Sequence, residues 1–119
     1  MFELIAFDAD DTLWHNELLY DQTQAQLVEL LADYADGQTV VQRLFATEMQ
    51  NLELYGYGIK SFTLSMIETA IEVSAGQITG VQIRQIIDFA RQMLIELHRN
   101  GYYELEHLGQ LPALLEKLR

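Results

Sequence analysis

The chain has 119 residues, of which 50% are hydrophobic and one is proline, so it suits one folded domain rather than a disordered segment. Its 7 Lys and Arg against 18 Asp and Glu give a net charge of −11, which disfavours nucleic acid and membrane surfaces as partners. The absence of cysteine excludes disulfides, a thiolate nucleophile and cysteine-ligated zinc. Because we find neither a signal peptide nor an apolar run of roughly 18 residues, we expect a cytoplasmic location.

The first predicted element is a short strand over residues 2–7. This apolar run is interrupted only by Glu3 and ends at Asp8, and its Phe, Leu and Ile content is typical of a strand buried in a parallel sheet. No second strand is predicted in this sequence, so its backbone groups need a partner from elsewhere. We therefore expect the chain to pair with a missing core or to associate with itself through this strand.

The next two predicted elements are helices. Leucines recur near helical spacing over 17–34, and Gly37 closes that segment. A second helix is expected over 39–55, and the two glycines within 56–58 predict a turn after it. The positions expected on the apolar side of the second helix are Val40, Leu44 and Leu54.

Three further helices complete the prediction. The third spans 61–75 and stops at Gly76, and the last runs from Pro112 to the end of the sequence. The fourth begins at a capping box formed by Thr79 and Gln82 and ends at Asn100-Gly101. Its expected apolar face consists of Ile83, Ile87, Ala90, Leu94 and Leu97.

The segment directly after the predicted strand carries the chemistry. Asp8 and Asp10 can both face the crevice at the carboxyl end of a buried strand, where open α/β sheets bind ligands. One carboxylate can attack phosphorus to form an aspartyl-phosphate, and the other can exchange a proton with the leaving oxygen and the attacking water. Two anions beside a phosphate need a divalent cation among them, and hard oxygen ligands suit magnesium. The alternative, that these aspartates only cap a turn, does not explain the strand and threonine beside them.

The sequence Asp8-Ala9-Asp10-Asp11-Thr12 resembles the first motif of the haloacid dehalogenase-like (HAD) superfamily, Asp-x-Asp-x-Thr after an apolar strand. By this resemblance Asp8 is the nucleophile and a Mg²⁺ ligand through its carboxylate, and Asp10 is the general acid/base and a Mg²⁺ ligand through its backbone carbonyl. Thr12 supports the loop geometry, while Asp11 occupies a position that the motif leaves free. The dehalogenases of this superfamily lack the second aspartate, so Asp10 implies phosphatase chemistry rather than cleavage of a carbon–halogen bond.

The resemblance also implies the fold class and the domains. The expected fold is α/β, HAD-like with a Rossmann-like core, of which this mostly α chain holds the first strand and a helical cap. Residues 1–16 form the core strand and catalytic loop, 17–105 the cap, and 106–119 a helix returning to the core. A cap of this kind closes over the site, excludes water and selects the substrate.

The family's second-motif Ser or Thr, third-motif Lys and fourth-motif acidic pair have no counterpart in this sequence. Without them the phosphate lacks most of its charge stabilisation, so we expect this chain alone to be inactive. The function implied is hydrolysis of a small phosphorylated metabolite, with a sugar phosphate, a nucleotide or a phosphoglycolate-like acid all open as substrates. The alternative is a non-catalytic helical module, or a degenerate HAD relative, that acts through another chain.

Three further residues are candidates for substrate contact. His15 lies next to the motif and can line its crevice. Tyr57 and Lys60 lie at the glycine-rich turn after the second helix, where a cap loop can reach the substrate. The other histidines, His98 and His107, show no metal-ligand spacing and are assigned to packing or to the surface.

Overall fold

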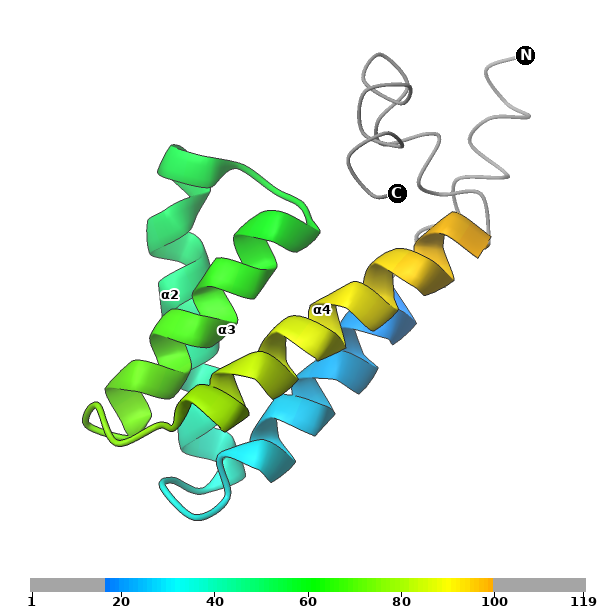
Figure 1. Cartoon of the computed structure of the whole chain (residues 1–119). Coiled ribbons are helices and arrows are strands. Elements are labelled where there is room, and N and C mark those ends of the chain that lie inside the picture. Colours follow the sequence, from blue (N-terminus) through cyan, green and yellow to red (C-terminus); the bar gives the residue numbers. More distant parts are fainter. Residues whose placement is uncertain (1–16, 100–119) are drawn as a thin grey trace, which may run out of the picture.

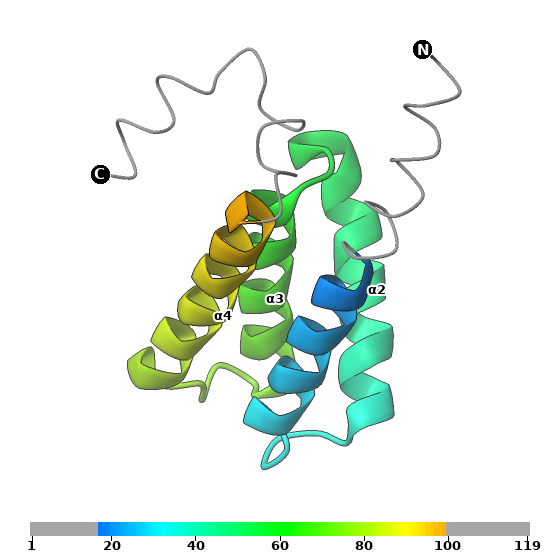
Figure 2. The same cartoon turned by 90° about the vertical axis from the view of Figure 1, so that its right-hand side faces the viewer.

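The computed structural model describes residues 17–99, which form an antiparallel bundle of helices. A first helix over 17–30 leads through a turn into α2 (Gly37–Tyr55), which is followed by α3 (Ile59–Val73) and α4 (Gly80–Arg99). The helices run alternately up and down, and the first helix lies beside α4 (Figures 1 and 2). No strand occurs within residues 17–99. The predicted strand and the predicted last helix lie outside the described residues, and the structure does not show the expected Rossmann-like core.

A single apolar core joins the four helices. Tyr20 of the first helix packs edge-on against Phe62 of α3, with ring centroids 4.8 Å apart. Among residues 17–99, no helix is both long and apolar enough to cross a membrane. The buried apolar side chains are Leu19, Leu27, Leu31, Val40, Leu44, Ile59, Phe62, Met66, Ala70, Ile86, Ala90, Met93 and Leu97.

The first two helices differ at their ends from the prediction. The first helix stops at residue 30 rather than 34. After it, backbone hydrogen bonds between residues three apart, such as that from the Tyr34 amide to the Leu31 carbonyl (2.9 Å), form a turn. The second begins at Gly37 because the Asp36 carboxylate accepts a hydrogen bond from the Thr39 amide (2.7 Å). Leu54, predicted on the apolar side, is 76% exposed, because the buried face of α2 consists of Val40, Leu44, Thr47 and Asn51 instead.

The end of α3 is a Schellman turn. The helix runs from Ile59 to Val73, two residues earlier at each end than predicted. The Gly76 amide donates to the Ile71 carbonyl (2.8 Å) and the Ala75 amide to the Glu72 carbonyl (3.1 Å). The predicted stop near Gly76 is confirmed, although the residue that first turns left-handed is Ala75, with φ of 52°.

The predicted capping box at the start of α4 is confirmed. The Gln82 amide donates to Thr79 Oγ1 (3.1 Å), and the Thr79 amide donates to Gln82 Oε1 (3.1 Å). The same oxygen accepts a hydrogen bond from the Tyr34 hydroxyl (2.8 Å), which ties the first turn to α4. Side chains therefore cap the helices at the lower end of the bundle in Figure 1.

Candidate functional site

The residues predicted to perform the chemistry lie outside the described part of the chain. These are Asp8, Asp10, Thr12 and His15. Within residues 17–99, no group of three Asp, Glu or His side chains is placed to hold a metal ion. The magnesium site therefore stays a prediction from the motif.

The turn predicted to reach the substrate forms the tip of the α2–α3 hairpin, defined here as residues 54–60. Gly56 and Gly58 have positive φ values of 71° and 124°, a conformation that side chains with a Cβ rarely adopt. The Gly56 amide closes α2 on the Leu52 carbonyl (2.9 Å), and the Gly58 carbonyl starts α3 by accepting from the Phe62 amide (3.0 Å). Two glycines thus reverse the chain within three residues.

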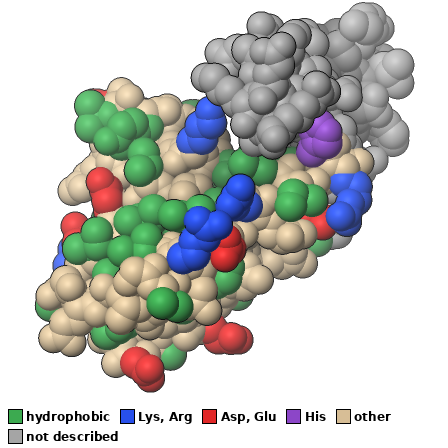
Figure 3. All heavy atoms as spheres, in the orientation of Figure 1, with side chains coloured by type: hydrophobic (Ala, Val, Ile, Leu, Met, Phe, Trp, Pro, Cys, Tyr) green, Lys and Arg blue, Asp and Glu red, His purple; other side chains and the backbone are tan. Residues whose placement is uncertain are grey.

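The tip is exposed and carries both described candidates. The side chain of Tyr57 is 88% exposed, and Lys60 lies exposed in the first turn of α3. The neighbouring Leu54 and Tyr55 are 76% and 50% exposed. Figure 3 shows hydrophobic side chains gathered over the end of α2, in the upper left of the view. Such an exposed apolar group is typical of a surface that meets another part of a protein or a ligand.

The electrostatics of the tip favour an anion. The start of α3 has no side-chain cap, whereas the Asp36 carboxylate caps α2 and the Thr79 hydroxyl caps α4. None of these three helices has an acidic residue in its first turn. Unpaired amides and the helix dipole make such an N-terminus weakly positive. Lys60 adds a full positive charge at the same place, in a chain with a net charge of −11.

The tip lies at the same end of the bundle as the two ends of the described segment. In both Figure 1 and Figure 2, the start of the first helix, the end of α4 and the turn between α2 and α3 lie at the upper end, and the other two turns lie at the lower end. The predicted catalytic loop is separated from residue 17 by only a few residues of chain. The bundle therefore presents Tyr57 and Lys60 on the side where the chain enters it.

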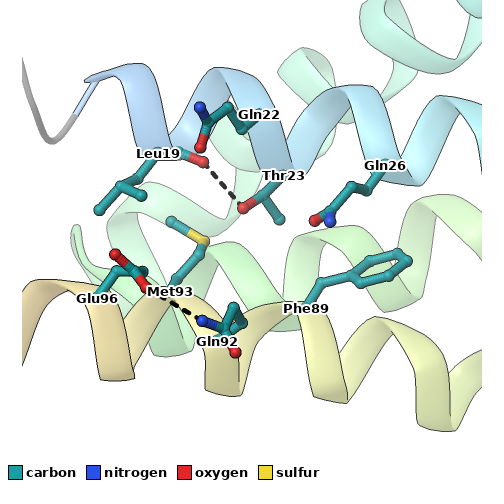
Figure 4. A pocket seen from close by; sticks show the side chains of 8 residues that line it. All are labelled: Leu19, Gln22, Thr23, Gln26, Phe89, Gln92, Met93 and Glu96. Carbon is teal, nitrogen blue, oxygen red and sulfur yellow. Dashed lines mark hydrogen bonds between the residues drawn. The ribbon is translucent and has the colours of Figure 1, made fainter.

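Two crevices flank the first helix, and neither suits a phosphate. The crevice against α4 encloses about 200 Å³ and is shown in Figure 4. Its Gln92 amide donates to Glu96 (3.2 Å) and its Thr23 hydroxyl to the Leu19 carbonyl (2.9 Å). Its lining residues are Leu19, Gln22, Thr23, Gln26, Phe89, Gln92, Met93 and Glu96, with no cation among them.

The second crevice lies between the first helix and α2 and is a shallow space of about 730 Å³. Asp21 and Glu29 contribute negative charge to it, and no Lys, Arg or His lines it. Farther along α2, burial raises the pKa of the half-buried Glu48, because the charged form loses hydration. Glu48 lies about 10 Å below the tip by helical rise, too far to share a ligand with Lys60.

The remaining basic groups of α2 and α4 are not gathered at the tip. Arg43 pairs with Glu72 (3.5 Å), Arg84 with Asp88 (3.4 Å) and Arg99 with Glu96 (3.0 Å). Arg91 lies exposed in the middle of α4. His98, near the end of α4, lies on the surface, as predicted. The end of α4, with His98 and Arg99, lies at the same end of the bundle as the tip, but Arg99 is paired with Glu96, whereas Lys60 lies at the tip itself.

Comparison with solved structures gives a clear match. The chain is similar to a haloacid dehalogenase-like family hydrolase from Xanthomonas campestris, with 40% sequence identity and a TM-score of 0.61. The match covers 66% of this chain and 33% of that one, so this chain spans about a third of the relative's length. No protein-family model and no curated protein matches the chain. Identity this high over a shared helical fold indicates common ancestry rather than a chance resemblance of helices.

Proposed function

Because this chain belongs to the haloacid dehalogenase-like family, we propose that it contributes the nucleophile and the helical cap of a magnesium-dependent phosphatase. The substrate is a small phosphorylated metabolite, hydrolysed through an aspartyl-phosphate. The hydrolase from Xanthomonas campestris supports the general class of reaction, and the Asp8-x-Asp10-x-Thr12 pattern supports phosphoryl chemistry. In this proposal, residues 1–16 belong to the core, 17–105 to the cap and 106–119 to the helix that returns to the core.

The proposed reaction uses the two aspartates in sequence. A carboxylate oxygen of Asp8 attacks phosphorus, and the bond to the ester oxygen breaks as Asp10 donates a proton to it. Asp10 then takes a proton from water as the water attacks the phosphorus of the aspartyl-phosphate, which releases inorganic phosphate and restores Asp8. Asp8 and Asp10 offer the oxygen ligands that Mg²⁺ prefers, and the ion would neutralise charge between the carboxylates and the phosphate.

The cap supplies selectivity in this proposal. Asp8 precedes Glu17 by nine residues, which can span at most about 30 Å when fully extended. The chain therefore keeps the catalytic loop within about 30 Å of the start of the bundle. The uncapped start of α3 and Lys60 attract the anionic substrate, and the exposed ring of Tyr57 covers its apolar part. The observation that carries this role is the position of the tip at the end where the chain enters the bundle.

The test is an assay of the protein that carries this chain together with the family's remaining motifs. We expect Mg²⁺-dependent hydrolysis of an aryl phosphate, and we expect Asp8→Asn to lower kcat at least about 10³-fold because the nucleophile is lost. The matched control is Asp11→Asn, at the position that the motif leaves free, which is expected to retain activity within a few-fold. Full activity in Asp8→Asn would remove Asp8 from the nucleophile role.

A further inference from the structure

Polar contacts join α2 to α3 at three levels, which are spaced about one helical turn apart on both helices. Because the helices are antiparallel, residues nearer the end of α2 contact residues nearer the start of α3. The lowest contact is the exposed ion pair, and the other two lie within the buried interface. The three pairs are Arg43–Glu72 (3.5 Å), Thr47–Thr69 (3.4 Å) and Asn51–Ser65 (3.0 Å).

The contact nearest the tip is the most completely paired. Asn51 is 6% exposed and lies one turn before the end of α2. Its side-chain amide nitrogen donates both to Ser65 Oγ (3.0 Å) and to Glu68 Oε1 (2.8 Å). Ser65 is fully buried, so a shift of α2 along α3 would leave the Asn51 amide and this hydroxyl without partners in an apolar interface.

The tip is anchored in the core by the buried side chain of Ile59, but it lacks a buried polar contact like that of Asn51 among the described side chains. Its helix ends are closed by Gly56 and Gly58, and the start of α3 has no side-chain cap. Glycine leaves the backbone free to adopt several conformations. Because the contact of Ile59 is apolar and has no direction, the position of Tyr57 and Lys60 on the bundle depends on how α2 and α3 are held together just below them.

We propose that Asn51 is a positioning residue that fixes the register of α2 against α3 and thereby the place of the tip. The proposal rests on the function proposed above for Tyr57 and Lys60. A buried apolar pair at this level would give similar stability but tolerate several registers, because apolar contacts have no direction. Buried polar groups fix the register of packed helices in other systems, because only one alignment satisfies them.

The first test uses amide hydrogen exchange in the full chain carrying Asn51→Leu, which keeps the size of the side chain and removes its donors. The probes are the amides of Gly56 and Phe62, whose hydrogen bonds bound the tip, and the amide of Ile83 in α4 is the internal reference. We expect exchange at Gly56 and Phe62 to become at least about 10-fold faster while Ile83 is unchanged. The matched control, Thr69→Val, removes the next contact down and should leave Gly56 within about two-fold.

A second variant tests the same contact in case Asn51→Leu prevents the chain from folding. Glu68 is exposed, so Glu68→Ala removes one acceptor of Asn51 without opening the core, and a smaller change in the same direction is expected. Unchanged exchange at Gly56 and Phe62 in both variants would overturn the proposal. An equal increase at Ile83 would also overturn it, because Asn51 would then only stabilise the bundle as a whole.

The third measurement separates this proposal from the proposed function. In the active protein, Asn51→Leu should raise KM for an aryl phosphate about five-fold and leave kcat within about two-fold, because Asn51 touches no reacting atom. Altered exchange at the tip with an unchanged KM would show that Asn51 positions the tip but that the tip does not meet the substrate. That result would contradict the cap's proposed role and leave the register assignment in place.

Discussion

Ala75 is the one described residue other than glycine with a left-handed backbone, at a φ of 52°. A Cβ in this conformation crowds the following carbonyl and costs about 1–2 kcal/mol. The Schellman turn at the end of α3 nevertheless requires a left-handed residue at this position. The next residue, Gly76, has a φ of 80° and already relieves the same crowding there.

We therefore expect Ala75→Gly to stabilise the bundle. The gain should be about 0.5–1 kcal/mol, since relief of the Cβ clash exceeds the extra backbone entropy of glycine in the unfolded chain. Urea unfolding measures it. The matched control is Ala46→Gly, at an exposed site inside α2, which should cost about 1 kcal/mol. A loss of stability in both variants would show that Ala75 is not strained.

Local polar patterns in the sequence were predictive at the scale of single residues. Thr79 and Gln82 form the capping box because both bonds lie within four residues of chain. The role of Asn51 could not be predicted in this way, because its partners Ser65 and Glu68 are 14 and 17 residues away. A buried asparagine on a helix cannot be told from an exposed one until the neighbouring helix is placed.

Helix starts at the lower end of the bundle depend on charge as well as on hydrogen bonds. The hydrogen bond from the Thr39 amide, followed by that from its hydroxyl, holds the pKa of Asp36 below the ordinary value of 3.8. A folded pKa below the unfolded one means that the charged cap stabilises α2 at pH values above 3.8. That contribution is lost as the pH falls through the lower value of the folded state.

We expect Asp36→Asn to change the pH dependence of Tm. Asparagine can still cap α2 but carries no charge, so the wild-type protein should have the higher Tm at pH 6, and the difference should shrink as the pH drops below 3.8. Thermal unfolding at several pH values measures this. Asp36→Ala, which removes the cap itself, should lower Tm at every pH. A gap between wild type and Asp36→Asn that does not vary with pH would contradict this account.

The buried face of α4 shows what helical periodicity can and cannot specify. Ala90 and Leu97 are buried as predicted, whereas Ile83, Ile87 and Leu94 are only partly buried. The centre of the buried face lies instead at Ile86, Ala90, Met93 and Leu97. The apolar pattern identified the helix but not the centre of its buried face. The reason is that α4 packs against both α3 and the first helix, whereas the predicted row of apolar residues describes contact with one neighbouring helix.

At the scale of the whole molecule, the sequence predicted four successive helices of a cap, with breaks at Gly37, at 56–58 and at Gly76, and residues 17–99 form four helices with turns close to these positions. Short turns between amphipathic helices leave few arrangements other than antiparallel neighbours. Membership of the HAD-like family, inferred from five residues at the start of the chain, is supported by the similarity of the helical fold. The periodicity of the sequence could not predict that the tip lies at the same end of the bundle as the start of the first helix and the end of α4, because this depends on how the four helices pack.

The arrangement of the bundle predicts which lysine or arginine affects substrate binding. In the active protein we expect Lys60→Ala to raise KM for a phosphorylated substrate about 10-fold, the effect of losing one charged hydrogen bond, with little change in kcat. Steady-state kinetics measure both constants. Arg84→Ala, which removes an exposed cation paired with Asp88, should leave both constants within about two-fold. Equal effects of the two variants would mean that the tip does not face the substrate.

The account as a whole depends on a covalent step at Asp8, and acid quenching during turnover tests it most directly. Aspartyl-phosphates survive brief acid treatment, so the quenched protein can be digested and its peptides weighed by mass spectrometry. We predict that the peptide containing Asp8 gains the mass of one phosphoryl group, only when substrate and Mg²⁺ are both present. Phosphate release during the same turnover with no modified peptide, or with the phosphoryl group on another residue, would contradict the account.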